Sequence, residues 1–139
     1  MKVVLDTNIL VSGLLWRGAP YRCLLALRAG LADLILSPPI LDEFRNVLVG
    51  KFRHTTAEAE EAVAFVRESA TLIDIPGTLR IVKDDPEDDK FIETARIAGA
   101  DYIVSGDHHL LALGKEAGVT VIGARDFLSI LSGVSESSE

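Results

Sequence analysis

The chain has 139 residues, a net charge of −7 and one cysteine, and 48% of its residues are hydrophobic. This length and composition fit one folded domain that buries its own core, and a single cysteine excludes an internal disulfide. The negative charge argues against a protein that holds nucleic acid mainly by bulk electrostatic attraction. No apolar run reaches the roughly 18 residues of a membrane span or resembles a signal peptide, so we expect a cytoplasmic protein without a membrane anchor.

Short apolar segments rich in β-branched residues alternate with helix-like segments along the chain. Such segments are typical of strands that are buried on both faces, as in a parallel sheet. The five predicted strands cover residues 3–5, 34–36, 71–75, 102–105 and 119–122.

The helix-like segments are bounded by residues that commonly begin or end helices. Pro20 fits a helical first turn, and Gly30 fits a C-terminal cap. Asp85 should cap a later helix, with Pro86 at its first helical position. The predicted helices cover residues 9–16, 20–29, 40–48, about 55–69, 86–98, 110–116 and 125–131.

This alternation predicts an α/β fold: a single three-layer domain with a five-stranded parallel sheet of order 3-2-1-4-5, flanked by helices. The first and fourth strands are then neighbours at the point where the strand order reverses. Ligand sites in such sheets form beyond the carboxyl ends of the strands at that point. The domain should span residues 1–131, and the polar tail 132–139 should be disordered.

Both central strands are followed by an aspartate. Asp6 ends the first strand and Asp107 closely follows the fourth, so their carboxylates should flank one crevice. In the third predicted helix, Glu43 lies about 60° from Ile40, at the edge of the apolar stripe. It should therefore point partly inward, toward the same crevice.

A run of five acids occupies residues 84–89. Asp85 is explained as a helix N-cap, and Glu87 and Asp88 are explained as acids favoured by the positive end of the helix dipole. Asp89 has less local reason to be acidic, and we choose it as the third acid of the site. Asp85 and Asp88 remain open as alternatives.

Carboxylates that converge within a few ångströms repel one another, so without a cation at least one pKa must rise. Hard oxygen ligands of this kind suit Mg²⁺ or Mn²⁺, which accept phosphate oxygens and can activate water. Asn8 and Ser105 are polar neighbours that could orient ligands or water. The chain has no matched Cys/His set for zinc, and we interpret His108 and His109 as part of a solvated turn.

Together these residues resemble the PIN-domain nucleases, in particular the small bacterial and archaeal members related to the VapC toxins. The matching pieces are Val-Leu-Asp-Thr-Asn at 4–8, Glu43, and the segments 85–95 and 100–107, in that order. The resemblance implies a parallel sheet of the predicted order. It also implies an acidic pocket that binds Mg²⁺ or Mn²⁺ and endonucleolytic cleavage of single-stranded RNA.

The resemblance also assigns roles to individual residues. The four catalytic acids it implies are Asp6, Glu43, Asp89 and Asp107. Of these, Asp6, Asp89 and Asp107 would hold the metal ion, with Asn8 and Ser105 in supporting positions. Many relatives are toxins restrained by an antitoxin protein, and many form homodimers, so the resemblance implies both kinds of partner.

A basic group beyond Glu43 could hold the RNA backbone: Arg45, Lys51 and Arg53. A solvated helix end would have the same composition, and both interpretations stay open. The alternative function is a non-catalytic PIN-like module that binds RNA or protein without cleaving it. Two findings would contradict the nuclease: Asp6 and Asp107 on opposite edges of the sheet, or a buried lysine or arginine where the ion should bind.

Overall fold

The computed structural model describes residues 1–82 and 86–133. Helices and strands alternate along the chain, and two short 3₁₀ helices, η1 and η2, interrupt the pattern. The elements are β1 (Lys2–Leu5), α1 (Thr7–Leu15), α2 (Ala19–Arg28), β2 (Asp33–Leu36), α3 (Pro38–Gly50), α4 (Thr56–Arg67), β3 (Ala70–Leu72), η1 (Pro86–Asp88), α5 (Asp89–Ala98), β4 (Tyr102–Val104), α6 (His108–Ala112), η2 (Gly114–Ala117), β5 (Thr120–Ile122) and α7 (Ala124–Ser132).

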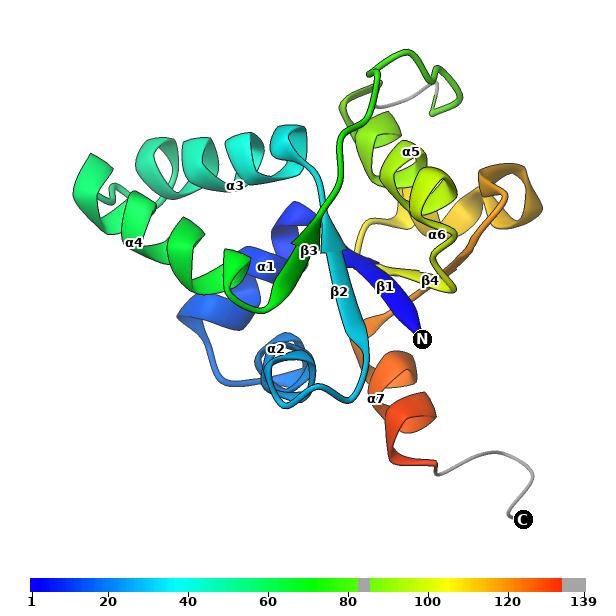
Figure 1. Ribbon diagram of the computed structural model, residues 1–139, viewed down its shortest axis with the longest axis horizontal. Helices are drawn as coiled ribbons and strands as arrows, with labels where there is room; N and C mark the ends of the chain where they lie inside the picture. Colours follow the sequence, from blue (N-terminus) through cyan, green and yellow to red (C-terminus); the bar gives the residue numbers. More distant parts are fainter. Residues whose placement is uncertain (83–85, 134–139) are drawn as a thin grey trace.

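The five strands form one sheet in the order β3-β2-β1-β4-β5, and every neighbouring pair is parallel. This confirms the predicted fold class and strand order. Leu5 lies opposite Val104, so the carboxyl ends of β1 and β4 emerge side by side. Helices α1 to α4 lie on one side of the sheet and α5 and α6 on the other (Figure 1).

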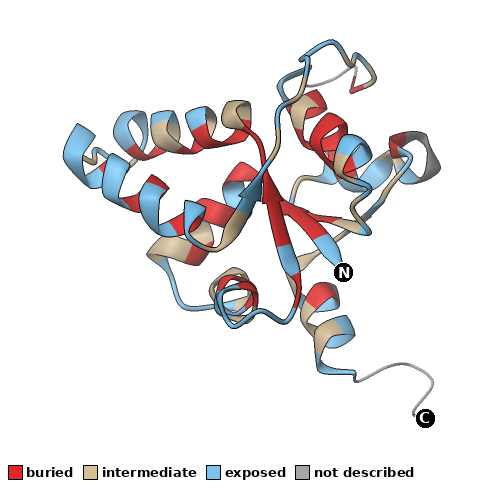
Figure 2. Ribbon diagram, in the orientation of Figure 1, coloured by how far each residue is buried: buried red, intermediate tan, exposed pale blue. Residues whose placement is uncertain are grey.

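The core is densest around β1, where Val3, Val4 and Leu5 are fully buried. Helix α5 packs against β1, β2 and β4 and contributes the buried side chains of Phe91 and Ile92. Figure 2 shows the same division, with buried residues in the strands and on the inner sides of the helices. Burial on both faces explains why the strands are almost continuously apolar.

The start of α5 differs from the sequence prediction. The expected cap, Asp85, lies outside the described residues. Pro86–Asp88 forms a 3₁₀ turn, and the α-helix begins only at Asp89. A 3₁₀ turn holds three residues instead of 3.6, so side chains ahead of Asp89 point in other directions than a continuous α-helix would give them.

Other helices and strands also begin or end at residues that differ from the sequence prediction. Strand β3 ends at Leu72, opposite the last residue of β2, because Pro38 begins α3 soon afterwards and no partner strand remains. The helix predicted at 110–116 is divided into α6 and η2. Helix α7 continues to Ser132, and the rest of the expected tail, 134–139, lies outside the described residues. Within the described ranges, no helix is both long enough and apolar enough to cross a membrane.

Candidate active site

Asp6 is the most deeply buried acid at the carboxyl edge of the sheet, with 3% of its surface exposed. Its Oδ1 accepts a hydrogen bond of 2.9 Å from the Ile9 N–H, which caps α1. Its Oδ2 accepts a short hydrogen bond from the Ser105 hydroxyl. The same Ser105 oxygen accepts the Asp107 N–H at 2.9 Å. Ser105 therefore bridges the two strand ends and holds Asp6 and Asp107 at one edge of the sheet.

The surroundings of Asp6 disfavour its charged form. Burial raises the pKa of its carboxyl from 3.8 to about 6, although the hydrogen bonds from Ser105 and Ile9 oppose the shift. The negative charges of Asp107 and Glu43 raise that pKa further. A cation placed among these groups would favour the charged carboxylate.

Asp107 is half-buried, and its carboxylate caps the short helix α6 by accepting the His109 N–H at 2.8 Å. Partial burial is the largest influence on the pKa of Asp107 and raises it, whereas a hydrogen bond with the Asp88 side chain lowers it. The bond from the His109 N–H and the nearby His108 and His109 rings act in the same direction. The pKa of Asp107 consequently lies below its ordinary value.

The hydrogen bond with Asp107 brings Asp88, rather than Asp89, to the strand ends. Asp88 is buried and is the last residue of the 3₁₀ turn η1. A hydrogen bond between two carboxyl groups requires a proton on one of them. A bound cation could take the place of that proton.

Asp89 is also buried, but its contacts lie elsewhere. Its Oδ1 accepts the Ile81 N–H at 2.8 Å and the Val82 N–H at 2.9 Å. Its Oδ2 is buried and has no hydrogen-bond partner among the described residues. These contacts anchor the segment before η1 to α5, and they give Asp89 a structural explanation independent of any metal ion.

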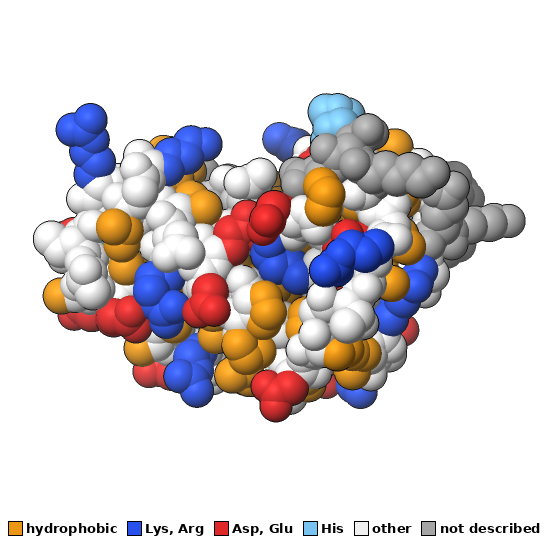
Figure 3. Space-filling model, turned by 90° about the horizontal axis from the view of Figure 1, so that it is seen from above, with side chains coloured by type: hydrophobic (Ala, Val, Ile, Leu, Met, Phe, Trp, Pro, Cys, Tyr) orange, Lys and Arg blue, Asp and Glu red, His pale blue; other side chains and the backbone are white. Residues whose placement is uncertain are grey.

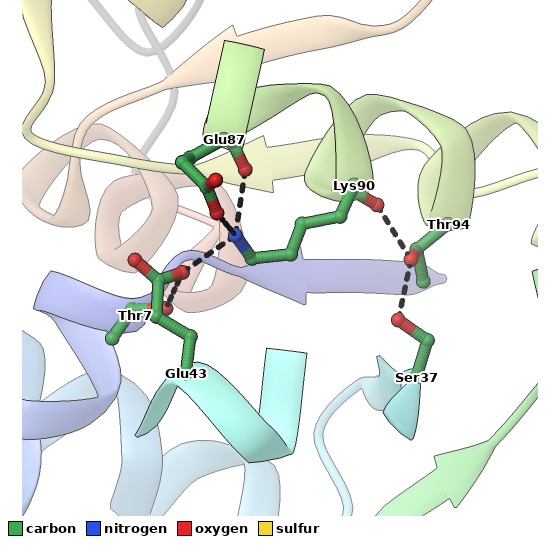
Figure 4. A network of polar contacts seen from close by, with 6 residues as sticks. All are labelled: Thr7, Ser37, Glu43, Glu87, Lys90 and Thr94. Carbon is green, nitrogen blue, oxygen red and sulfur yellow. Dashed lines mark hydrogen bonds and ion pairs between the residues drawn. The ribbon is translucent and has the colours of Figure 1, made fainter. Parts of the chain in front are cut away.

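Glu43 approaches the cluster from α3 and is oriented by two residues that the sequence analysis did not single out. Its Oε1 accepts a hydrogen bond of 2.7 Å from the Thr7 hydroxyl and lies 2.9 Å from the Lys90 ammonium. Lys90 also donates to the Glu87 carbonyl at 2.6 Å. Figure 4 shows the Lys90 side chain extended between Glu87 and Glu43, so that it connects α5 with α3.

A second contact fixes the same two helices. The Ser37 and Thr94 hydroxyls, both fully buried, lie 2.8 Å apart (Figure 4). Thr94 also donates to the Lys90 carbonyl at 2.7 Å. The start of α3 and the backbone that carries Lys90 are therefore held together.

A nearly buried lysine at this site bears directly on the metal hypothesis, because only 12% of the Lys90 side chain is exposed. Its ion pairs are with Glu43 and Glu87. Asp6 instead has its own donors, Ser105 and Ile9. Lys90 thus neutralises the Glu43 side of the cluster, while the Asp6 side keeps an uncompensated negative charge.

The other candidate residues are distributed differently. Asn8 is exposed in the first turn of α1, and its side chain makes no hydrogen bond with a described residue. Arg45 is engaged in ion pairs with Asp42 at 2.9 Å and Glu60 at 2.5 Å, so its charge is already compensated. Lys51 and Arg53 are exposed near the end of α3.

The chemistry of the donors fits a hard divalent ion, since Asp6, Asp88 and Asp107 supply only carboxylate oxygens. In the part of the chain that the structure describes, no three His, Cys, Asp or Glu side chains are gathered tightly enough to hold a metal ion. Asp6 and Asp107 accept hydrogen bonds from protein donors, whereas Asp88 Oδ2 is buried and has no hydrogen-bond partner among the described residues. Figure 3 views the molecule from above and shows acidic side chains near the middle of this face, with Lys and Arg on both sides.

Comparison with known proteins gives one family match. A family model described as "PIN domain" matches residues 2–109. The structure of PAE2754 from Pyrobaculum aerophilum has a TM-score of 0.66 and 18% identity, over 96% of this chain and 90% of that one. VapBC2 from Rickettsia felis, bound to a DNA fragment from its promoter, has a TM-score of 0.63 and 14% identity, over 87% and 97%. A comparison with curated proteins gave no match. At these identities the structural likeness establishes the fold alone.

Proposed function

This chain belongs to the PIN-domain family, and from that premise we propose that it is a divalent-metal-dependent endoribonuclease that cleaves single-stranded RNA. The observation that carries the proposal is the buried Asp6 carboxylate, which Ser105 links to Asp107 at the carboxyl edge of the sheet. Burial, and secondarily the charges of Asp107 and Glu43, raises the pKa of Asp6. Uncompensated acids at the carboxyl edge of a parallel sheet are typical of a site that binds a cation together with its substrate.

We assign the metal ligands to Asp6, Asp88 and Asp107, and the ion to Mg²⁺ or Mn²⁺. Asp88 replaces Asp89 of the sequence analysis because Asp88 contacts Asp107, whereas Asp89 binds the Ile81 and Val82 N–H groups. When bound, such an ion polarises a phosphate oxygen and makes a nearby water more acidic. Ser105 keeps the Asp6 and Asp107 ligands in register by its two hydrogen bonds.

Glu43 is proposed to receive the proton of the attacking water. Thr7 and Lys90 both bond to its Oε1, so Oε2 is the oxygen suited to accept that proton. Lys90 and Thr7 act as positioning residues, because they hold the carboxylate without contacting the reacting atoms. The Lys90 ammonium also limits the repulsion between Glu43 and the other acids.

We further propose that the protein is the toxin of a toxin–antitoxin pair, acts in the cytoplasm, forms a homodimer and is restrained by an antitoxin protein. Its support is the family resemblance and the shared fold with a VapBC complex. An adjacent short reading frame for a small DNA-binding protein would support the toxin assignment. Failure of any such protein to bind or inhibit the purified chain would contradict it.

A non-catalytic PIN-like module that binds RNA or protein is the second candidate. The ion pair between Lys90 and Glu43 favours it, because an ammonium group already occupies one oxygen of the Glu43 carboxylate. The two functions differ in one measurement, which is cleavage of an unstructured RNA by the purified protein.

The test is a time course of end-labelled RNA with Mn²⁺, run in parallel with wild-type protein and Asp6→Asn. We expect internal cleavage by the wild type, inhibition by EDTA and loss of cleavage in the variant. Equal cleavage by both proteins would indicate a contaminating nuclease and contradict the proposal. Absence of cleavage together with RNA binding would favour the non-catalytic module.

A further inference from the structure

An exposed tryptophan stands at the end of α1. Trp16 is the single tryptophan of the chain, and 56% of its surface is exposed. Its ring meets Phe52 edge-on, with 5.7 Å between ring centroids, while Phe52 is half-buried and packs partly against the core. A hydrogen bond of 3.0 Å from the Trp16 N–H to the Ser12 carbonyl holds its backbone. The edge contact with Phe52 therefore orients the indole, while more than half of the Trp16 surface remains open to solvent.

Two cations accompany this aromatic pair. Lys51 and Arg53 flank Phe52 in sequence, and the Lys51 ammonium lies 5.8 Å from the centre of the Phe52 ring. Both are exposed, and neither forms an ion pair within the described residues. Arg53 has a left-handed backbone, with φ of 57°, which is uncommon for a residue other than glycine. In a chain of net charge −7, these two cations without ion pairs, one on each side of the half-buried Phe52 in sequence, form a local exception.

The position of this surface relates it to the acids. Asp6 caps the start of α1 and Trp16 caps its end, which places them about 15 Å apart along the helix. Phe52 follows α3, the helix that carries Glu43. Since α1 and α3 pack together, both helices lead from the acidic cluster to the aromatic pair. A few nucleotides of extended single strand cover this distance.

We propose that Trp16, Phe52, Lys51 and Arg53 form a binding surface for single-stranded RNA, in which a base stacks on Trp16 and the two cations face phosphates. Stacking on aromatic rings beside cations that follow the backbone is how single strands are bound without sequence preference. The proposal deepens the proposed function, because this surface would hold the strand whose scissile bond lies at the acids. Compared with the RNA-binding group expected from the sequence, this surface omits Arg45, whose charge is compensated, and adds the aromatic residues Trp16 and Phe52.

The chemistry favours RNA over a protein partner. The core of a protein–protein interface is depleted in lysine, and its charged residues lie mostly at the rim. Here the Lys51 ammonium lies 5.8 Å from the centre of the Phe52 ring, and Arg53 follows Phe52 in the chain, so phosphate and base can be bound together.

The first experiment uses the fluorescence of Trp16, which is unambiguous because no other tryptophan is present. Asp6→Asn protein in EDTA, which cannot cleave, is titrated with a short oligouridylate. We expect saturable quenching of the tryptophan emission and protection of Trp16 from iodide. Tryptophan emission that does not change with oligouridylate would overturn the proposal. Emission that changes only with protein concentration would also overturn it, because it would indicate that a second copy of the chain covers this surface.

The second experiment measures the affinity of labelled oligouridylate by anisotropy in the same Asp6→Asn background. Trp16→Ala should weaken binding between about fivefold and a hundredfold, as loss of one stacked base does. Lys51→Ala/Arg53→Ala should reduce the slope of log affinity against log salt by about 1.4, since two phosphate contacts are lost. Circular dichroism and thermal unfolding verify that each variant is folded.

The matched control is Arg67→Ala/Arg125→Ala, which removes the same charge from two exposed cations in α4 and α7. It should leave the salt slope unchanged. If the Lys51/Arg53 variant and the control behave alike, or Trp16→Ala binds normally, the surface is not an RNA site. Because these measurements need neither metal nor cleavage, their outcome is independent of whether the wild type proves to be a nuclease.

Discussion

Asp88 and Asp107 share a hydrogen bond between their carboxyl groups, although one lies in the turn before α5 and the other follows β4. The adjacent Asp89 instead binds the backbone of Ile81 and Val82. The two neighbouring aspartates thus make separate contacts: Asp88 contacts Asp107 at the strand ends, and Asp89 binds the backbone of the segment before η1. Substitutions at the two positions should separate catalysis from stability.

We predict that Asp88→Asn strongly reduces RNA cleavage and leaves the fold intact, because it removes one of the carboxyl oxygens proposed to hold the ion. Asp89→Asn should keep most of the activity but lower the free energy of unfolding by about 1–3 kcal/mol, as expected when hydrogen bonds to a charged group are weakened. Cleavage rates and urea unfolding of both proteins check this. Loss of cleavage in a stable, folded Asp89→Asn protein would instead make Asp89 the ligand.

The raised pKa of Asp6, about 6, predicts a dependence of stability on pH. The folded protein holds this proton more tightly than the unfolded chain does, so stability from this group falls as pH rises from about 4 to about 6. Above about pH 6, the rise in the pKa of Asp6 from 3.8 to about 6 corresponds to about 3 kcal/mol of lost stability in the metal-free protein. Asp6→Asn should therefore be more stable than wild type in EDTA at about pH 8, and the difference should shrink near pH 5.

Urea unfolding of both proteins at the two pH values tests this prediction for Asp6. A variant that is less stable than wild type by the same amount at both pH values would contradict it. Metal should reverse the effect in the wild type alone, because an ion that binds the ionised carboxylate stabilises the folded state.

Ser105 should be needed for both stability and activity. Ser105→Ala leaves Asp6 Oδ2 without its donor and the Asp107 N–H without its acceptor, at a cost of about 1–3 kcal/mol. The pH at which cleavage reaches half its maximum should rise, since the pKa of Asp6 loses a contact that lowers it. Ser129→Ala, at an exposed position in α7, is the control. A pH profile identical to wild type would show that Ser105 does not position Asp6.

Lys90 should act through Glu43. Lys90→Met keeps the aliphatic stem and removes the ammonium that holds Glu43 Oε1, so we expect about tenfold to hundredfold slower cleavage, as for other residues that orient a functional group. Lys90→Arg should restore part of the rate. A faster enzyme after Lys90→Met would mean that the lysine blocks the site, which the single-turnover rate at saturating Mn²⁺ would reveal.

The strand order could be predicted because β1 and β4 are unbroken apolar runs, and burial on both faces leaves few other arrangements for Val3–Leu5 and Ile103. The ends of the helices and strands were harder to predict from the sequence. Strand β3 stops at Leu72 because its partner β2 stops, a limit that depends on the neighbouring strand and not on residues 73–75.

The site was predictable where it depends on strand ends and less so where it depends on turns. Asp6 and Asp107 could be paired from topology alone, because parallel neighbouring strands end at one edge. The sequence could not decide between Asp88 and Asp89 as the third acid, because the direction of Asp88 depends on the 3₁₀ turn at η1, which a continuous α-helix does not predict. The sequence did not indicate a role for Thr7 or Lys90, because each contacts Glu43, which lies on another helix.

Calorimetric titration with Mn²⁺ tests the central claim most directly, because it asks whether these acids form one ion site without requiring an RNA substrate. Wild-type protein and Asp89→Asn should bind Mn²⁺ with similar affinity, while Asp6→Asn and Asp107→Asn should each bind at least about tenfold more weakly. The account would be contradicted if the wild-type protein bound no Mn²⁺, or if Asp6→Asn and Asp107→Asn both bound Mn²⁺ as tightly as the wild type.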